Sequence, residues 1–240
     1  MAAQLLEVEI LPDADAVAAA AAKRIAAEAV AAVAARGRFV VAVSGGRTPW
    51  VMLRELARLD LPWSDIHLFQ VDERVAPDGD PYRNYTHLQS SLLAYAPLLS
   101  ANVHPMPVGA GDLNAAAKQY AAEIRAAAGD PPRFDFVHLG LGGDGHTASL
   151  VPGDASLAIT DADVALSGPY QQHLRMTLTY PAINRARRIL FVVTGDEKAG
   201  VLKRLQAGDT SIPAGRVSRA QATVIADRAA ARQLMIDKPE

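Results

Sequence analysis

Two short apolar segments of this chain each run into a glycine-rich turn. Residues 38–43 (RFVVAV) precede SGGRTP at 44–49, and residues 136–139 (FVHL) precede GLGGDGH at 140–146. β-Branched and aromatic residues favour strands, and glycines let a ligand approach the main chain. Open α/β sheets build ligand sites from such turns, at the carboxyl ends of their strands. The pattern therefore constrains the fold to the α/β class.

Strand-like and helix-like segments alternate along the rest of the chain. Strands are expected at 6–11, 38–43, 66–71, 136–139, 188–193 and 222–226, with further extended segments at 102–108, 162–166 and 175–179. Helices are expected at 13–35, 50–59, 84–93, 114–128 and 197–205, with a last one opening at Asp227. This order predicts a doubly wound, mostly parallel sheet with helices on both faces. No repeat or long linker divides residues 1–240, so we expect a single domain.

Composition excludes several function classes. The net charge is −2, which favours neither nucleic acid nor an anionic membrane as a partner. The absence of cysteine removes disulfides, thiolate metal sites and cysteine nucleophiles. Residues 1–7 lack the basic start of a secretion signal, and charged residues interrupt the alanine-rich stretch 16–35. We therefore expect a cytoplasmic protein.

The turn at residues 44–49 has the features of an anion site. Thr48 is suited to cap a helix and Pro49 to occupy its first turn, so free N–H groups and the positive end of the helix dipole would converge there. Ser44 and Thr48 add hydroxyl groups, and Arg47 adds positive charge. Neither a P-loop nor a dinucleotide-binding signature is present in this turn. These residues fit a single phosphate, although an ordinary strand–helix turn fits them equally well.

Four strand ends carry chemically active side chains: 44–48, 72–74, 144–146 and 194–198. Because the carboxyl ends of parallel strands lie along one edge of a sheet, these groups are expected to meet in one crevice. The remaining histidines, His67, His87, His104, His138 and His173, share no metal-ligand spacing and are expected to be structural or exposed. Trp50 and Trp63 are expected to pack in or near the core.

Three motifs, SGGRTP at 44–49, VDERVAP at 71–77 and LGGDGHTASLVP at 141–152, resemble the signatures of the 6-phosphogluconolactonase family. The resemblance implies a modified Rossmann-like fold that uses no nucleotide, metal or other cofactor. It implies hydrolysis of 6-phospho-D-glucono-1,5-lactone to 6-phospho-D-gluconate in the oxidative pentose phosphate pathway. The expected partner is this sugar-phosphate lactone alone, bound by a monomer or weak homo-oligomer.

Carried onto this sequence, the resemblance assigns a catalytic role to His146 as general base, since imidazole titrates near neutral pH. Asp144 would orient its ring or hold the attacking water. The expected substrate-binding residues are Ser44, Gly45, Gly46, Arg47, Thr48, Asp72, Arg74, Gly142, Gly143, Arg175 and Lys198. The glycine-turn N–H groups would stabilise the oxyanion, and Arg175 and Lys198 would add charge at the phosphate. Taken alone, those two cations would be read as solvated surface residues, and Asp72 as an acid, a partner of Arg74 or a loop cap.

Two other functions are compatible with parts of the pattern. Glucosamine-6-phosphate deaminases have a similar glycine turn, but they carry a glutamate where this chain has Val151 and a tyrosine where it has Arg74. A non-catalytic sugar-phosphate sensor of the same fold would need no His146. Val151 and Arg74 therefore favour the lactonase over the deaminase, and His146 favours it over the sensor.

Overall fold

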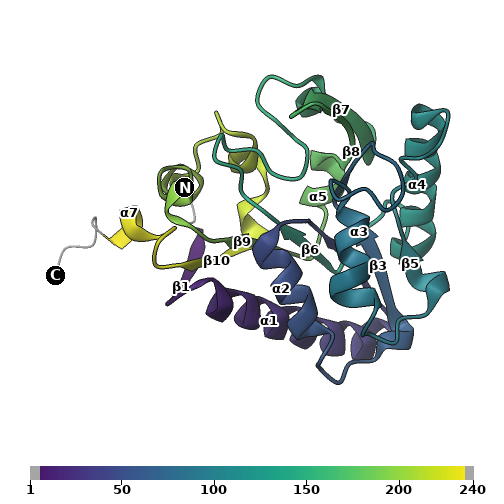
Figure 1. Ribbon diagram of the computed structural model, residues 1–240, viewed down its shortest axis with the longest axis horizontal. Helices are drawn as coiled ribbons and strands as arrows, with labels where there is room; N and C mark the ends of the chain where they lie inside the picture. Colours follow the sequence, from purple (N-terminus) through teal and green to yellow (C-terminus); the bar gives the residue numbers. More distant parts are fainter. Residues whose placement is uncertain (1–5, 236–240) are drawn as a thin grey trace.

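The computed structural model describes residues 6–235, so the first five residues, on which part of the expectation about a secretion signal rests, lie outside it. Its main sheet has seven strands, all paired in parallel (Figure 1). Their spatial order is β1 (Glu7–Leu11), β10 (Ala222–Asp227), β9 (Arg188–Val193), β6 (Phe136–Leu139), β2 (Phe39–Val43), β3 (Ile66–Gln70) and β5 (Val103–His104). The predicted α/β class and mostly parallel sheet are confirmed.

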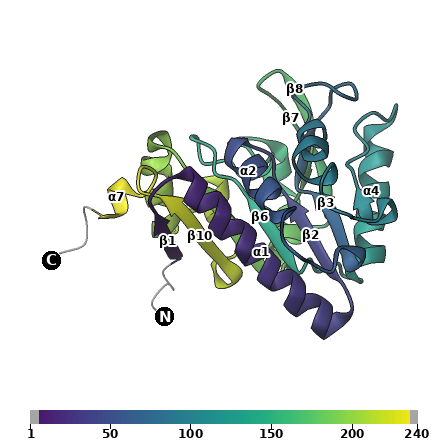
Figure 2. The same cartoon turned by 60° about the horizontal axis from the view of Figure 1, so that its bottom comes forward.

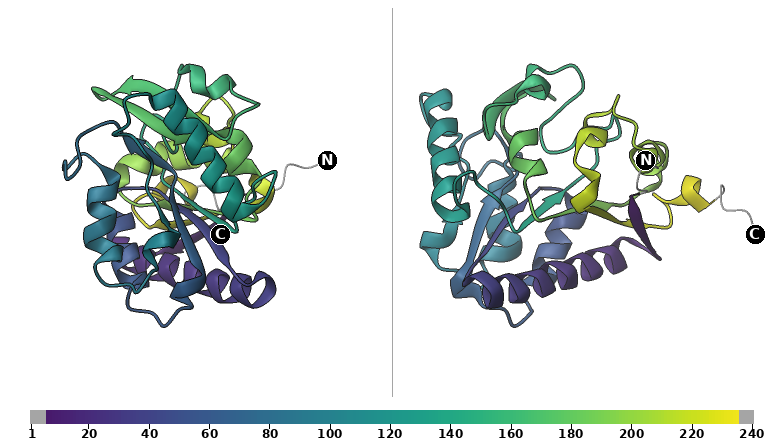
Figure 3. Two further views of the ribbon diagram at one scale, coloured as in Figure 1. Left: turned by 90° about the vertical axis from the view of Figure 1, so that its right-hand side faces the viewer. Right: turned by 180° about the vertical axis from the view of Figure 1, so that it is seen from behind.

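Helices cover both faces of this sheet, as predicted. One face packs against α1 (Ala14–Arg36), α2 (Arg47–Leu56) and α3 (Asn84–Leu88), and Figure 2 shows α1 and α2 lying across it. The opposite face packs against α4 (Leu113–Ala128), α5 (Tyr180–Asn184) and α6 (Ala199–Ala207), and α7 (Arg232–Met235) rests on α6 (Figure 3). Alternate residues of β2 enter the two cores, with Val41 and Val43 on one side and Val40 and Ala42 on the other.

A second, smaller sheet stands over the carboxyl edge of the first. It is antiparallel, in the order β4 (Asp72–Arg74), β8 (His173–Leu178) and β7 (Val164–Tyr170). The alternation of strands and helices did not predict it, because this rule describes parallel crossovers only. β7 and β8 form a hairpin whose tip residues, Gln171 and Gln172, adopt left-handed backbone angles, φ 49° and 67°. Such a two-residue turn matches the twist of paired strands.

Helix ends follow the predicted signals at α1 but not at α2. The Asp13 carboxylate caps α1 by accepting from the Ala16 N–H at 2.9 Å, and Gly37 ends it with φ 72°. The expected start of α2 at Trp50 is wrong: the helix begins at Arg47 after Gly46, so Thr48 lies inside its first turn and does not cap it.

Several other boundaries differ from expectation. The expected helix over 84–93 changes to a π-helical turn at Gln89–Leu93, and the last helix begins at Arg232 rather than Asp227. Short 3-10 turns occupy Trp63–Asp65, Ser100–Asn102, Ala155–Ala158, Asp196–Lys198, Pro213–Arg216 and Arg219–Gln221. Within residues 6–235, none of the helices combines the length and apolar character needed to span a bilayer.

Candidate active site

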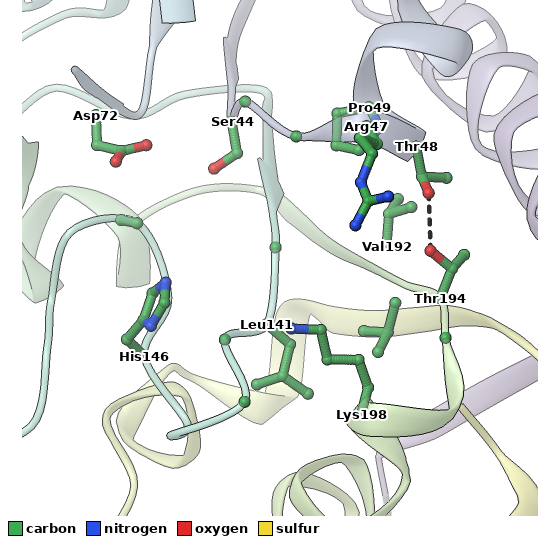
Figure 4. A pocket seen from close by; sticks show the side chains of 18 of the residues that line it. Ser44, Arg47, Thr48, Pro49, Asp72, Leu141, His146, Val192, Thr194 and Lys198 are labelled. Atoms are coloured by element: carbon green, nitrogen blue, oxygen red, sulfur yellow. Dashed lines mark hydrogen bonds between the residues drawn. The ribbon is translucent and has the colours of Figure 1, made fainter. Parts of the chain in front are cut away.

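The four predicted strand ends meet in one cavity. It has a volume of about 720 Å³ and lies between the carboxyl edge of the parallel sheet and the small sheet (Figure 4). All but one of the predicted site residues line it: Ser44, Gly45, Gly46, Arg47, Thr48, Asp72, Arg74, Gly142, Gly143, His146, Arg175 and Lys198. The exception is Asp144, which contacts His146 from outside the lining. The expectation of a single crevice is therefore confirmed.

His146 and Asp144 form a hydrogen-bonded pair. Asp144 Oδ1 lies 2.6 Å from His146 Nδ1 and 3.1 Å from the His146 backbone nitrogen. Partial burial raises the pKa of Asp144, but hydrogen bonds and the nearby imidazole lower that pKa by more, so the carboxylate stays ionised. A carboxylate on Nδ1 favours the tautomer with the proton there, which leaves a lone pair on Nε2. The pair therefore offers a base with a fixed ring orientation.

Gly142 makes room for the ring of His146. A Cβ atom at Gly142 would lie 2.1 Å from His146 Nδ1, so no other residue fits there without moving the imidazole. The Gly142 N–H already donates to the His146 carbonyl at 2.8 Å. Of the glycine-turn N–H groups expected to stabilise the oxyanion, that of Gly142 therefore already has a partner within the turn. Gly143 has no hydrogen-bond partner among residues 6–235, so its N–H is free for a ligand.

A buried histidine holds the turn at Ser44. His138, fully buried on β6, accepts the Ser44 N–H on Nδ1 at 3.2 Å, and burial lowers its pKa to about 3. It is therefore neutral at physiological pH, as an acceptor must be. The Ser44 side chain points into the cavity (Figure 4). On the other side, Thr48 Oγ1 lies 2.7 Å from Thr194 Oγ1, which joins the turns after β2 and β9.

Two arginines lie side by side on neighbouring strands of the small sheet. Arg74 on β4 pairs in register with Arg175 on β8, and both line the cavity. The side chain of Arg175 is buried, at 4% exposure, so it is not a solvated surface cation. Burial, and secondly the charge of Arg74, lower the pKa of Arg175. Two like charges at one wall make a strong anion-binding region.

The acidic residues of this wall organise it. The Asp72 carboxylate accepts from Ser149 Oγ at 2.6 Å rather than pairing with Arg74. Arg74 instead donates to the carbonyl of Tyr82 and to Asn84 Oδ1, at 2.8 and 3.0 Å. Glu73 is completely buried and accepts three backbone N–H groups, from Arg74, Asn84 and Tyr85. It thereby fixes the loop that leads into α3.

Lys198 reaches the cavity from the turn after β9. It closes the short turn Asp196–Lys198 after β9, and Figure 4 shows its amino group directed toward the centre, near Leu141. Gly195 begins this turn, and its N–H donates to the carboxylate of Asp227 at 3.1 to 3.2 Å. The tip of β10 therefore positions the lysine.

Sequence reasoning missed several residues of the lining, three of which carry polar side chains from the hairpin and from β10. Tyr170 and Gln171 reach the cavity from the β7–β8 hairpin, and Asp227 reaches it from the end of β10. The hairpin residues carried no usable signal, because their place depends on the antiparallel sheet. The other histidines form no metal site: within the described chain, no three His, Asp or Glu side chains are grouped to hold an ion. As expected, Trp63 is buried, and Trp50 packs beside the core, stacked on His87.

Comparison with known proteins agrees with this architecture. Residues 12–226 match the family described as glucosamine-6-phosphate isomerases/6-phosphogluconolactonase. A protein named 6-phosphogluconolactonase from Mycobacterium tuberculosis is 39% identical over 241 residues, covering 95% of this chain and 98% of that protein.

Solved structures show the same fold. The 6-phosphogluconolactonase of Thermotoga maritima superposes with a TM-score of 0.83 at 30% identity, over 92% of this chain and 98% of that one. The Trypanosoma cruzi enzyme of the same name gives 0.85 at 28% identity, over 95% and 97%. A monomeric glucosamine-6-phosphate deaminase gives 0.82 at 21% identity over 95% of this chain and 100% of that one, so the fold alone does not separate the two activities. The chain belongs to the glucosamine-6-phosphate isomerase/6-phosphogluconolactonase family.

Proposed function

We propose that this protein hydrolyses 6-phospho-D-glucono-1,5-lactone to 6-phospho-D-gluconate, a step of the oxidative pentose phosphate pathway. The observation that carries the proposal is the Asp144–His146 pair, 2.6 Å apart, beside a cavity lined by the cationic side chains Arg74, Arg175 and Lys198. The name and 39% identity of the mycobacterial relative support the choice of substrate.

In the proposed reaction, His146 Nε2 takes a proton from water as the water oxygen attacks C1 of the lactone. The imidazolium that forms is stabilised by Asp144, which accepts from Nδ1. The oxygen of the former carbonyl becomes negative and accepts a hydrogen bond from the free Gly143 N–H. The tetrahedral intermediate then collapses, the bond from C1 to the ring oxygen breaks, and that oxygen is protonated to give the open acid.

The phosphate binds at the turn Ser44–Thr48, with charge from Arg175 and Lys198. The first N–H groups of α2 and the hydroxyl of Ser44 serve as neutral donors. Arg74, held by Asn84 and the Tyr82 carbonyl, binds substrate oxygens near the reacting carbon. Asp72, tied to Ser149, contacts the sugar hydroxyls.

Two residues argue against the deaminase. The position of the deaminase glutamate is Val151, a buried aliphatic side chain that cannot relay a proton. Arg74 stands at the place of the deaminase tyrosine and lines the cavity. A non-catalytic sensor is disfavoured by the aligned Asp144–His146 pair, which binding alone does not require. We further propose that the chain acts as one cytoplasmic domain, as a monomer or weak homo-oligomer, without nucleic-acid partners.

A direct assay tests the proposal. Purified protein should accelerate decay of the lactone above the spontaneous rate, in the presence of a chelator, and release no ammonia from glucosamine 6-phosphate. Decay at the spontaneous rate in a folded sample would refute the lactonase. Ammonia release would support the deaminase, and tight binding of sugar phosphate without turnover would support the sensor.

A further inference from the structure

We propose that Tyr170 is a positioning residue that sets both the orientation and the proton affinity of the Asp144–His146 pair. This inference rests on the proposed lactone hydrolysis. Tyr170 ends β7, directly before the hairpin tip, and its half-buried side chain lines the cavity.

The hydroxyl of Tyr170 completes the hydrogen bonding of Asp144. It donates to Asp144 Oδ2 at 3.1 Å, while Oδ1 accepts from His146 Nδ1 at 2.6 Å. Each carboxylate oxygen thus has its own donor, so the carboxylate cannot rotate without losing one. Burial, and then the charge of Asp144, raise the pKa of Tyr170, so its hydroxyl keeps the proton that it donates.

The ring of Tyr170 touches the two functional parts of the cavity. Its centroid lies 5.3 Å from that of His146, with the rings inclined at 66°, an edge-to-face contact that limits rotation of the imidazole. The Arg175 guanidinium carbon lies 5.1 Å from the ring centroid, and Arg175 also donates to the Tyr170 carbonyl at 3.3 Å. One side chain therefore contacts both the base and the buried cation.

The charged groups around Tyr170 define what its hydroxyl does. Asp144 and His146 face it from the glycine turn, and Arg175 faces it from β8; behind Arg175 lie Asp72, Glu73 and Arg74 of β4. A hydroxyl that donates to a carboxylate withdraws part of its negative charge. Asp144 therefore stabilises a protonated His146 less than an unshared carboxylate would.

Three variants separate these effects. Tyr170→Phe keeps the ring and should lower kcat about threefold to tenfold, as expected for one lost hydrogen bond, with KM nearly unchanged. The acid limb of its kcat/KM profile should move to higher pH. Tyr170→Leu should add a rise in KM, because Arg175 loses the ring. Tyr95→Phe, at an exposed tyrosine outside the cavity, should match the wild type.

A second readout needs no substrate. An NMR titration of the His146 imidazole should show its midpoint moving to higher pH in Tyr170→Phe and staying in place in Tyr95→Phe. Failure of the wild type to hydrolyse the lactone would refute the proposed function, yet the NMR shift would still support the positioning role. An unchanged midpoint in folded Tyr170→Phe would overturn that role. So would a fall in kcat with an unchanged pH profile, since simple packing would produce it.

Discussion

The two sheets contribute to the cavity in different ways. The parallel sheet supplies the turns after β2, β6 and β9, where main-chain groups and partly exposed side chains such as His146 line the cavity. The antiparallel sheet supplies side chains from within its strands. Two of them are deeply buried, with exposures of 6% for Asp72 and 4% for Arg175, and Glu73, between Asp72 and Arg74 on β4, is 0% exposed.

Because of this difference, the catalytic base lies at a turn of the parallel sheet, whereas the buried positive charge lies in the small sheet. A base at a turn can meet water, which the hydrolytic step requires. A buried arginine beside another arginine is costly in the empty protein, because desolvation and like-charge repulsion both oppose it. An anionic substrate offsets that repulsion, so binding of the substrate should stabilise the small sheet more than the parallel edge. The base at the parallel edge should therefore act mainly on kcat, and the buried Arg175 of the small sheet should act mainly on recognition.

The largest expected effect tests the catalytic half of this comparison. His146→Ala should lower kcat by about 10²- to 10⁴-fold, the contribution typical of a general base. Affinity for 6-phosphogluconate, measured by calorimetry, should change far less, because the small sheet is intact. His87→Ala, outside the cavity lining, is the matched control. A loss below about tenfold would remove His146 from the role of base.

The next effect tests recognition by the small sheet. Arg175→Gln should lower kcat/KM for the phosphorylated lactone by about 10- to 150-fold, equivalent to one charge-assisted interaction of about 1.5–3 kcal/mol. Lys198→Gln should cost less, because the lysine is more exposed and its charge is better screened. Unphosphorylated gluconolactone serves as the control substrate. Equal losses on both lactones would show that neither cation reads the phosphate.

Sequence alone was enough for the strands of the parallel half of the molecule, although not for every helix boundary there. The strands there are short apolar runs, and the helices between them carry clear boundary signals such as Asp13 and Gly37. Such signals are local in the chain. The crevice followed from them because parallel strands share one carboxyl edge, which explains why residues about a hundred positions apart, such as Ser44 and His146, were correctly brought together.

The antiparallel half depends on contacts that the sequence does not display. After β3, the three residues of β4 pair with β8, and this segment is too short to show a sequence pattern of its own. Tyr170 and Gln171 reach the cavity only because that pairing exists. Thr48 failed as a cap for a different reason: Gly46 lets the helix start one residue before it, and the Thr48 hydroxyl bonds Thr194 instead.

The smallest expected effect concerns how the parallel sheet holds its own turn. His138 has a pKa of about 3 in the folded protein, against an ordinary value of 6.5, because burial disfavours its charged form. Below about pH 6.5 the unfolded chain binds this proton and the folded protein does not, so the free energy of unfolding falls as pH falls. The contribution lost by about pH 5 is about 2 kcal/mol.

Urea unfolding of the wild type and of His138→Asn, compared from about pH 7 to about pH 5, measures this contribution. Asparagine keeps an acceptor for the Ser44 N–H but does not titrate in this range, so the variant should lose less stability on acidification. His67 and His104, whose pKa values are also lowered by burial, remain in both proteins and cancel in the comparison. Parallel pH dependences would mean that His138 takes up its proton in the folded protein. Protonation of His138 would then remove the acceptor of the Ser44 N–H in mild acid. The parallel edge would in that case contain a buried charge, as the small sheet does at Arg175.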